Sequence, residues 1–294
     1  MKKPIFKGSC TAMVTPYGQH GIDYNSLAKH IDYQAAGNTD ALLISGTTGE
    51  NATQSFDEHC TLLRYAAEKN NSRMKLIAGI GSNNTLTALE YGKVAEEAGY
   101  DGVLMVTPYY NKTTQKGLIE HFTYVADRIR VPMILYNVPS RTGIGFTAET
   151  YKTLSSHPNI NGVKEASGDF SLFSKIRCQC CDDLNIWCGN DDQTVPMMAL
   201  GAKGVISVAS NIIPSVVSKL CQLCLNGDFH AAEKVHLNYG ELFSDLFLET
   251  NPIPVKTAMN LMGMNAGAFR LPLIPMQGAN ESKLKATLHS HNLI

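Results

Sequence analysis

The sequence predicts a (β/α)8 TIM barrel with a C-terminal helical extension, and three observations lead to this fold class. Short apolar and β-branched runs recur about every 20–35 residues, the length of one βα unit. There are eight such runs, and eight βα units close into a barrel of about 250 residues. The chain has 294 residues, so it has room for this barrel and for additional helices.

The predicted strands alternate with segments of helical character. Their ranges are 8–14, 41–44, 75–79, 102–106, 133–136, 162–164, 185–188 and 205–208. A doubly wound open sheet is the alternative architecture for this alternation. It is disfavoured because residues 79–82 read Gly-Ile-Gly-Ser and lack the third glycine of a dinucleotide-binding turn.

Helices are predicted between the strands and throughout the last part of the chain. Segment 85–98 has apolar residues at helical spacing, and Gly99 after it allows the helix to end. Beyond the eighth strand the apolar period is helical over 213–227, 229–248, 254–262 and about 282–289. We therefore predict a catalytic barrel over residues 1–225 and a C-terminal helical region over residues 226–294.

Composition excludes several classes of function. Lys and Arg number 25 against 26 Asp and Glu, so the net charge of −1 leaves no basic excess for nucleic-acid phosphates. The apolar runs are shorter than the roughly 20 residues that span a bilayer. The N-terminus lacks the apolar stretch of about 7–15 residues that marks a secretory signal. We expect a cytoplasmic protein without nucleic-acid or membrane partners.

The eight cysteines are predicted to be reduced thiols. Several of them, such as Cys10 and Cys188, lie in hydrophobic segments, which is typical of small buried residues in a reducing compartment. The closely spaced cysteines within 178–181 and 221–224 have no flanking histidine to complete a zinc site. No metal site is predicted.

The loops after the strands carry the candidate chemistry, because the carboxyl ends of barrel strands converge on one mouth. Residues 46–50 read Gly-Thr-Thr-Gly-Glu, whose glycines, hydroxyls and N–H groups suit a small carboxylate or phosphate. The alternative is a turn that caps the next helix. Tyr109 and Tyr110 follow the fourth strand, Tyr136 ends the fifth, and Arg141 follows it. Phenols can relay protons and an arginine can clamp a carboxylate.

Lys164 ends the sixth predicted strand. A lysine there would be partly removed from water, which favours the neutral amine that attacks a carbonyl carbon. The alternative is a structural lysine that pairs with Glu165. The joint occurrence of a carboxylate cradle, tyrosines, an arginine and a lysine at four strand ends favours a Schiff-base enzyme.

Six motifs resemble those of the dihydrodipicolinate synthase family, within the pyruvate-dependent class I aldolase superfamily. They are, in order, GTTGE, TPYYN, YNVPSRTG, GVKEASG, GNDD and GVISVASN. The resemblance extends to residues 249–256 in the helical tail. It implies that pyruvate forms an imine with Lys164, becomes an enamine and adds to L-aspartate 4-semialdehyde. Cyclisation would give 4-hydroxy-tetrahydrodipicolinate, the branch point toward diaminopimelate and lysine.

The resemblance also implies a set of catalytic residues. Lys164 would be the nucleophile and Tyr136 the general acid–base at the imine. Thr47 and Tyr110 would join Tyr136 in a proton relay, with Tyr110 reaching in from a neighbouring subunit. The enzyme would therefore be a homo-oligomer, namely a tetramer built from tight dimers.

Three further residues would bind substrate. Thr48 would hold the pyruvate carboxylate, and Arg141 would bind the carboxylate of the semialdehyde. The carbonyl of Ile206 would lie near the lysine. An amine nucleophile needs neither a metal nor an organic cofactor, so the resemblance implies none.

Many relatives are inhibited by L-lysine at a subunit interface. The residues equivalent to that pocket are Asn51, Ala52, Phe56, His59, Asn83, Thr87 and Tyr109. Sensitive members have a histidine in place of Phe56 and a glutamate in place of Thr87. Since no carboxylate at Thr87 would pair with the lysine ammonium, we expect this chain to be insensitive to L-lysine.

Two alternative functions stay open, one within the same superfamily and one from a different class of protein. N-acetylneuraminate lyases and sugar-acid aldolases share the lysine and the tyrosine, but typically carry Ser-Thr in the first motif and lack the arginine. Thr47, Thr48 and Arg141 therefore favour the synthase. A barrel with a vestigial site could instead be a small-molecule binding or regulatory protein, since fold alone does not fix function. The presence of both Lys164 and Tyr136 disfavours this alternative.

Overall fold

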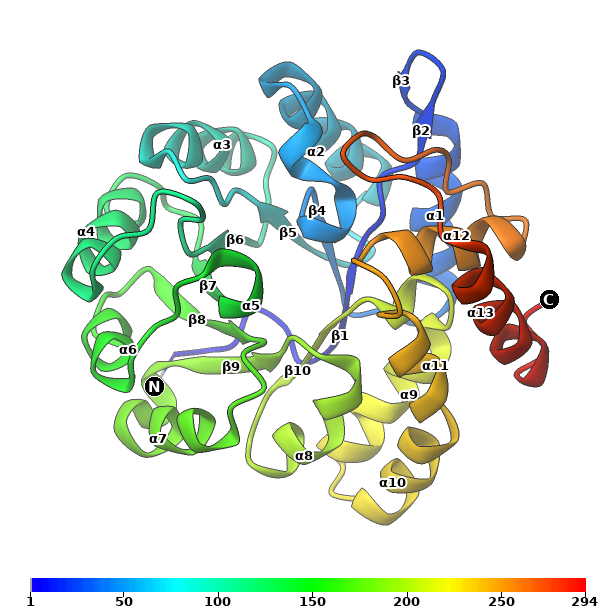
Figure 1. The fold of residues 1–294 in the computed structure, drawn as a ribbon. Coiled ribbons are helices and arrows are strands. Elements are labelled where there is room, and N and C mark those ends of the chain that lie inside the picture. Colours follow the sequence, from blue (N-terminus) through cyan, green and yellow to red (C-terminus); the bar gives the residue numbers. More distant parts are fainter. Residues whose placement is uncertain (1) are drawn as a thin grey trace.

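The computed structural model describes residues 2–294, which form a closed barrel of parallel strands surrounded by helices (Figure 1). Around the barrel the strands follow the order β1-β10-β9-β8-β7-β6-β5-β4, so the first strand pairs with the last. They are β1 (Gly8–Ala12), β4 (Ala41–Ile44), β5 (Lys75–Gly79), β6 (Gly102–Val106), β7 (Met133–Asn137), β8 (Ile160–Glu165), β9 (Asn185–Cys188) and β10 (Gly204–Ser207). The predicted fold class is confirmed.

The strand predictions differ from the structure at a few ends. The first strand stops at Ala12 rather than at residue 14, and β8 extends beyond the predicted 162–164 on both sides. The structure also has an unpredicted antiparallel pair outside the barrel, β2 (Tyr17–Gly18) and β3 (Gly21–Ile22). Strands of two residues are too short to produce a period of two.

Helices cover the outside of the barrel. They are α1 (Tyr24–Ala36), α2 (Phe56–Asn70), α3 (Thr85–Glu97), α4 (Gln115–Ala126), α6 (Ala148–Ser155), α7 (Phe170–Cys180), α8 (Thr194–Ala199) and α9 (Pro214–Leu225), and the short α5 (Pro139–Thr142) follows β7. Several begin at a capping side chain. At α2, Ser55 accepts a hydrogen bond from the Glu58 N–H, and the Glu58 carboxylate accepts one from the Ser55 N–H.

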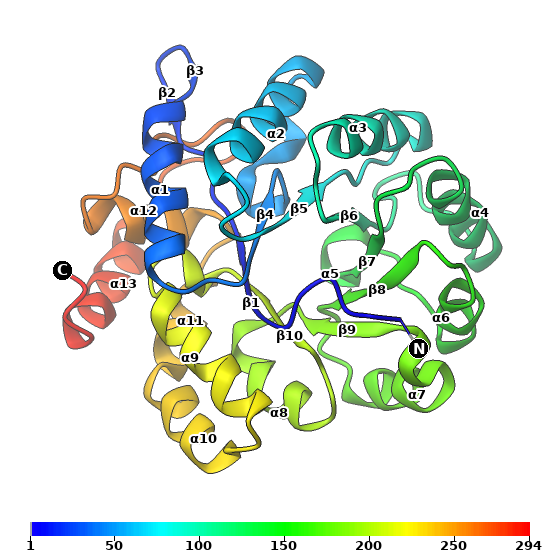
Figure 2. The ribbon, with the colours of Figure 1, turned by 180° about the vertical axis from the view of Figure 1, so that it is seen from behind.

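The C-terminal region adds four helices beside α9 and α1 (Figures 1 and 2). They are α10 (Phe229–Asn238), α11 (Gly240–Asp245), α12 (Ile253–Leu261) and α13 (Gly278–Ser290). The single helix predicted over 229–248 is wrong, because it is divided at Tyr239. Gly240 follows that break, and a glycine inside a helix costs about 1 kcal/mol relative to alanine. The boundary at 225/226 falls between α9 and α10 and stays a prediction.

Apolar side chains fill the barrel interior and close its amino end. Phe6, just before β1, stacks on Trp187 of β9 with ring centroids 4.9 Å apart. Figure 2 shows the N-terminal segment crossing this end of the barrel. A larger core lies between the strands and the outer helices. No helix within residues 2–294 combines the length and apolar character needed to cross a membrane.

Candidate active site

A cavity of about 200 Å³ lies at the carboxyl ends of the barrel strands. Five of the predicted site residues line it, namely Lys164, Tyr136, Thr47, Thr48 and Arg141. They come from β8, from β7, from the 3-10 turn after β4 and from α5. The barrel thus brings together residues that are up to 117 positions apart in the chain.

Lys164 lies deep in this cavity. Its side chain is 5% exposed, and its Nζ atom is 4.5 Å from the centroid of the Tyr136 ring. The two residues are paired in register on β8 and β7. Leu43, Leu104 and Val138 form an apolar part of the cavity wall. A buried amine beside a phenol ring is a suitable nucleophile for a carbonyl carbon.

Lys164 forms no ion pair with the residues that the structure describes. Glu165 points to the other side of β8, since side chains alternate along a strand. It accepts hydrogen bonds from Asn137 Nδ2, the Tyr151 hydroxyl and the Ser167 N–H. Burial raises the pKa of the Glu165 carboxyl. The alternative that Lys164 pairs with Glu165 is therefore wrong.

A buried ion pair fixes the residue that follows the Thr47–Gly49 turn. Thr47–Gly49 form the 3-10 turn η1, and Glu50 after it adopts a left-handed conformation with φ 55°. The Glu50 carboxylate lies 2.6 Å from Lys256 Nζ, and both side chains are fully buried. Lys256 also donates to the carbonyl oxygens of Thr15 and Ala268. Ser55, not this turn, caps α2, so the capping alternative is wrong.

The C-terminal region reaches the cavity through Asn251. Its side-chain Nδ2 donates to Thr48 Oγ1 at 3.0 Å, and its backbone carbonyl accepts from Arg141 Nη2 at 3.3 Å. The family resemblance covers the surrounding segment 249–256, but no role was predicted for Asn251. Its contacts join positions 203 and 110 residues apart, so local spacing gives no signal of them.

The buried carboxylate of Asp191 was also missed. It accepts hydrogen bonds from the Ser207 hydroxyl and from the N–H groups of Val208 and Ala209. Burial raises the pKa of this carboxyl. These bonds join the loop after β9 to the end of β10. The adjacent aspartates after the seventh strand were the only available signal of this contact.

Ile206 does not line the cavity. Its side chain is fully buried in the apolar interior of the barrel, and its backbone belongs to β10. The predicted role belongs to its backbone carbonyl alone, and that role stays a prediction.

Tyr110 lies outside the cavity of its own chain. It is 93% exposed and has φ 69° in the loop between β6 and α4. Hydrogen bonds fix this loop, because Asn111 Nδ2 donates to the Asn83 carbonyl and Asn83 Nδ2 donates to the Tyr109 carbonyl. The loop therefore presents the Tyr110 phenol to solvent.

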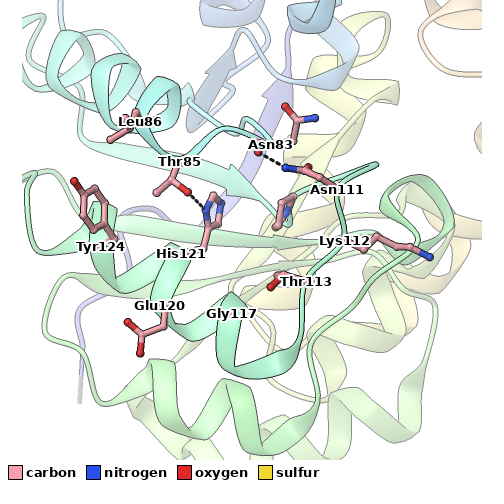
Figure 3. Close-up of a pocket in the computed structure, with 11 residues that line it drawn as sticks. Asn83, Thr85, Leu86, Asn111, Lys112, Thr113, Gly117, Glu120, His121 and Tyr124 are labelled. Carbon is pink, nitrogen blue, oxygen red and sulfur yellow. Dashed lines mark hydrogen bonds between the residues drawn. The ribbon is translucent and has the colours of Figure 1, made fainter.

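A wider cleft of about 680 Å³ lies beside this loop, at the start of α3 and along α4 (Figure 3). Figure 3 shows His121 of α4 turned toward Thr85 of α3, and the ring Nδ1 and Thr85 Oγ1 are 2.8 Å apart. Burial lowers the pKa of His121 to about 4. None of the predicted catalytic residues lines this cleft.

The residues equivalent to the lysine pocket lie on several elements around α2 and α3. Asn51 belongs to the 3-10 turn η2 (Asn51–Thr53), to which Ala52 also belongs. Phe56 and His59 both stack on Tyr91, with ring centroids 5.3 Å and 3.8 Å apart. Burial lowers the pKa of His59 to about 4. An aromatic stack therefore occupies part of this region.

The cysteines are all free. Cys178 and Cys181 are exposed, and the other six are buried. Within residues 2–294 no group of three or more His, Cys, Asp or Glu side chains is arranged to hold a metal ion.

Comparisons with known proteins give one consistent result. Residues 5–291 match the family model described as "Dihydrodipicolinate synthetase family". A 4-hydroxy-tetrahydrodipicolinate synthase 1 of Clostridium acetobutylicum is 48% identical over 290 residues, which cover 99% of each chain.

Solved structures agree with this match. A dihydrodipicolinate synthase from Aquifex aeolicus has a TM-score of 0.96 at 44% identity and covers 98% of this chain and 99% of that one. A chloride-inhibited dihydrodipicolinate synthase from Acinetobacter baumannii, complexed with pyruvate, has a TM-score of 0.96 at 37% identity. The alignment covers 98% of this chain and all of that one.

Proposed function

This chain belongs to the dihydrodipicolinate synthetase family, and we propose that Lys164 is the residue on which its condensation reaction takes place. The enzyme is a Schiff-base-forming lyase of diaminopimelate and lysine biosynthesis that condenses pyruvate with L-aspartate 4-semialdehyde. The observation that carries the residue assignment is the buried Lys164 amine, which faces Tyr136 inside a cavity that Thr47, Thr48 and Arg141 also line.

The first half of the reaction activates pyruvate. The unprotonated amine of Lys164 attacks the C2 carbonyl carbon, and loss of water leaves an imine bound to the chain. A proton then leaves the C3 methyl group, which gives an enamine. Tyr136 lies beside the amine, so it delivers the proton that the departing hydroxyl needs. Thr47 of the same chain continues this proton relay, together with Tyr110 of the partner subunit.

The second half joins the substrates and releases the enzyme. C3 of the enamine bonds to the aldehyde carbon of the semialdehyde, and the aldehyde oxygen takes up a proton. The substrate's own amine, once it has lost a proton, attacks the imine carbon. The ring closes, the C–N bond to Lys164 breaks, and 4-hydroxy-tetrahydrodipicolinate leaves with the free lysine amine restored.

Thr48 and Arg141 bind the two carboxylates in this scheme. Thr48 holds the carboxylate of pyruvate near Lys164. Arg141 is exposed at the cavity and binds the carboxylate of the semialdehyde. A guanidinium binds a planar carboxylate through two parallel hydrogen bonds. The related lyases typically lack this arginine, and the relatives reported above are named as synthases. We place the carbonyl of Ile206 near the lysine.

We infer the assembly from the position of Tyr110. Its exposed phenol lies outside its own cavity, which supports the assignment of this residue to the site of a neighbouring copy. The active form is then at least a dimer, and we assign a tetramer of two tight dimers. We place the enzyme in the cytoplasm, where eight free cysteines stay reduced.

A pair of assays tests the function. Purified enzyme receives pyruvate with L-aspartate 4-semialdehyde in one assay, and N-acetylneuraminate in the other. We expect product only in the first assay. Turnover of N-acetylneuraminate alone would overturn the assignment.

A further inference from the structure

The carbonyl oxygen of Gly49, at the end of the Thr47–Gly49 turn, accepts hydrogen bonds from two buried side chains. Gln54 Nε2 lies 3.1 Å from this oxygen, and the Tyr17 hydroxyl lies 3.2 Å from it. A carbonyl oxygen has two lone pairs, so these two donors satisfy it fully. Neither side chain lines the catalytic cavity, so both act on the turn without touching substrate.

The backbone around Gly49 needs such a restraint. A side-chain carbon at this position would lie 3.0 Å from Thr15 Oγ1 and 3.3 Å from the Met13 carbonyl oxygen, so the turn packs closely on the chain that follows β1. The glycine that allows this packing is also the residue with the freest backbone. Glu50 after it has φ 55°, a conformation that residues with side chains rarely adopt. Hydrogen bonds to the Gly49 carbonyl fix the peptide plane between these two residues, and with it the turn that carries Thr48.

The direction of each hydrogen bond follows from the groups present. Because the Gly49 carbonyl can only accept, Gln54 presents its NH2 group there, and that group also donates to the Tyr17 oxygen at 3.0 Å. Gln54 Oε1 accepts from the Ser45 hydroxyl at 2.6 Å. Ser45 has no second proton, so its oxygen accepts from His59 Nδ1 at 3.1 Å. The amide of Gln54 is thus bound at both its nitrogen and its oxygen, and it faces Gly49 in one orientation.

Tyr17 is also fixed by its neighbours. It belongs to β2, and its ring packs against the Arg270 guanidinium, whose carbon lies 4.0 Å from the ring centroid. Arg270 in turn donates to the Glu58 carboxylate. Burial raises the pKa of the Tyr17 hydroxyl to about 12, so the phenol keeps the proton that it donates to Gly49. The strand pair outside the barrel therefore supplies a fixed donor to the turn.

From this arrangement we infer that Gln54 and Tyr17 are positioning residues for pyruvate. They hold the Gly49 carbonyl and thereby set the place of the Thr48 hydroxyl relative to Lys164. This inference rests on the proposed function, in which Thr48 binds the carboxylate of pyruvate and Lys164 bonds to its C2 carbon. Loss of either donor weakens the carboxylate contact and leaves the chemistry of the amine intact.

The test measures imine formation alone, without the second substrate. Borohydride traps the imine at a range of concentrations of pyruvate, or of acetone, in which a methyl group replaces the carboxylate. Mass spectrometry of the Lys164 peptide gives the half-saturating concentration of pyruvate and the trapping rate of acetone.

Gln54→Met is the first variant, because it keeps the length of the side chain and loses the amide. We expect the half-saturating concentration of pyruvate to rise by about 2- to 12-fold, the effect of a lost neutral hydrogen bond. The trapping rate of acetone should change by less than about twofold, because acetone has no carboxylate for Thr48 to bind.

Tyr17→Phe tests the second donor. It keeps the ring against Arg270 and removes the hydroxyl, so pyruvate should again bind more weakly while acetone trapping stays nearly constant. Tyr100→Phe is the matched control, because the Tyr100 hydroxyl is also buried and donates to a backbone carbonyl, that of Leu63. We expect it to change neither measurement.

Folding and function are checked separately. Acetone trapping on Lys164 shows that a variant retains its reactive amine, and Tyr17→Phe decides the question if Gln54→Met does not fold. Equal losses for pyruvate and acetone, or an unchanged half-saturating concentration of pyruvate, would overturn the inference and leave the proposed function intact. A wild-type enzyme that forms no pyruvate adduct on Lys164 would overturn both.

Discussion

The Nζ atom of Lys164 lies 4.5 Å from the centre of the Tyr136 ring, and neighbouring strands hold the two residues in register. Backbone hydrogen bonds of β7 and β8 fix this relationship, so it does not depend on a mobile loop. Any group that bonds to the amine stands beside the phenol. The amine that we propose as nucleophile and the phenol that we propose as its proton donor are thus placed by the barrel itself.

Trapping with borohydride should locate the imine. In the presence of pyruvate, wild-type enzyme should gain one reduced adduct per chain, on the peptide that contains Lys164. Lys256 is a matched internal control, because it is also buried but is paired with Glu50. We expect no adduct there. Mass spectrometry that finds an undiminished adduct in Lys164→Ala would refute the assignment.

Tyr136→Phe should separate imine formation from turnover. The variant keeps the ring and loses the hydroxyl, so an adduct should still form while turnover slows by roughly 10²–10⁴, the usual effect of a positioned acid–base group. Tyr100→Phe is the control, since the Tyr100 hydroxyl is buried and bonds to the Leu63 carbonyl. Steady-state kinetics should show nearly unchanged turnover in this control. Similar losses in both variants would count against a proton-transfer role.

Arg141→Ala should impair the second substrate far more than pyruvate. A lost charged hydrogen bond to the semialdehyde carboxylate costs about 1.5–3 kcal/mol of binding free energy. KM values for the two substrates measure the difference. If both rise equally, Arg141 supports the structure and does not bind substrate.

L-lysine at millimolar concentration should leave the rate essentially unchanged. The equivalent pocket has Thr87 in place of a carboxylate, which removes about 1.5–3 kcal/mol of binding free energy. Phe56 is 46% exposed, and its ring offers at best a cation–π contact of about 0.5–2 kcal/mol. Half-inhibition below about 1 mM, where binding is worth roughly 4 kcal/mol, would contradict this prediction. The double variant Phe56→His with Thr87→Glu should gain sensitivity.

Two buried histidines should make stability depend on pH. Burial lowers the pKa of His59 and of His121 to about 4, whereas an unfolded histidine titrates near 6.5. Between these values the unfolded chain binds more protons, so the free energy of unfolding falls as pH falls from about 6.5 to about 4.

Replacing one histidine measures its contribution to this pH dependence of stability. His121→Asn keeps a polar group near Thr85 and removes the titration. Denaturant unfolding at several pH values should show a slope smaller than that of wild type by up to about 1.4 kcal/mol per pH unit. An unchanged slope would mean that His121 takes up its proton over the same pH range in the folded protein as in the unfolded chain.

The fold could be predicted well because its signals are local. Segment 41–44 is a short apolar run between turn residues, and the structure has β4 over the same residues. The site at the strand ends followed from this pattern, and Lys164 and Tyr136 indeed share one cavity.

What could not be predicted depends on tertiary contacts. Asn251 bonds to Thr48 across 203 positions, and Glu50 pairs with Lys256 across 206. No periodicity or spacing marks such pairs. The break at Tyr239 was missed for a different reason, because the apolar pattern continues through it and hides the weak local signal of Gly240.

Trp187 is the single tryptophan of the chain, and it is paired in register with Lys164 on the adjacent strand. Its indole is fully buried and stacked on Phe6. All intrinsic tryptophan fluorescence therefore comes from one site beside Lys164. A change in emission on adding pyruvate would report imine formation in real time without a label, and the same signal would follow loss of the barrel interior on unfolding.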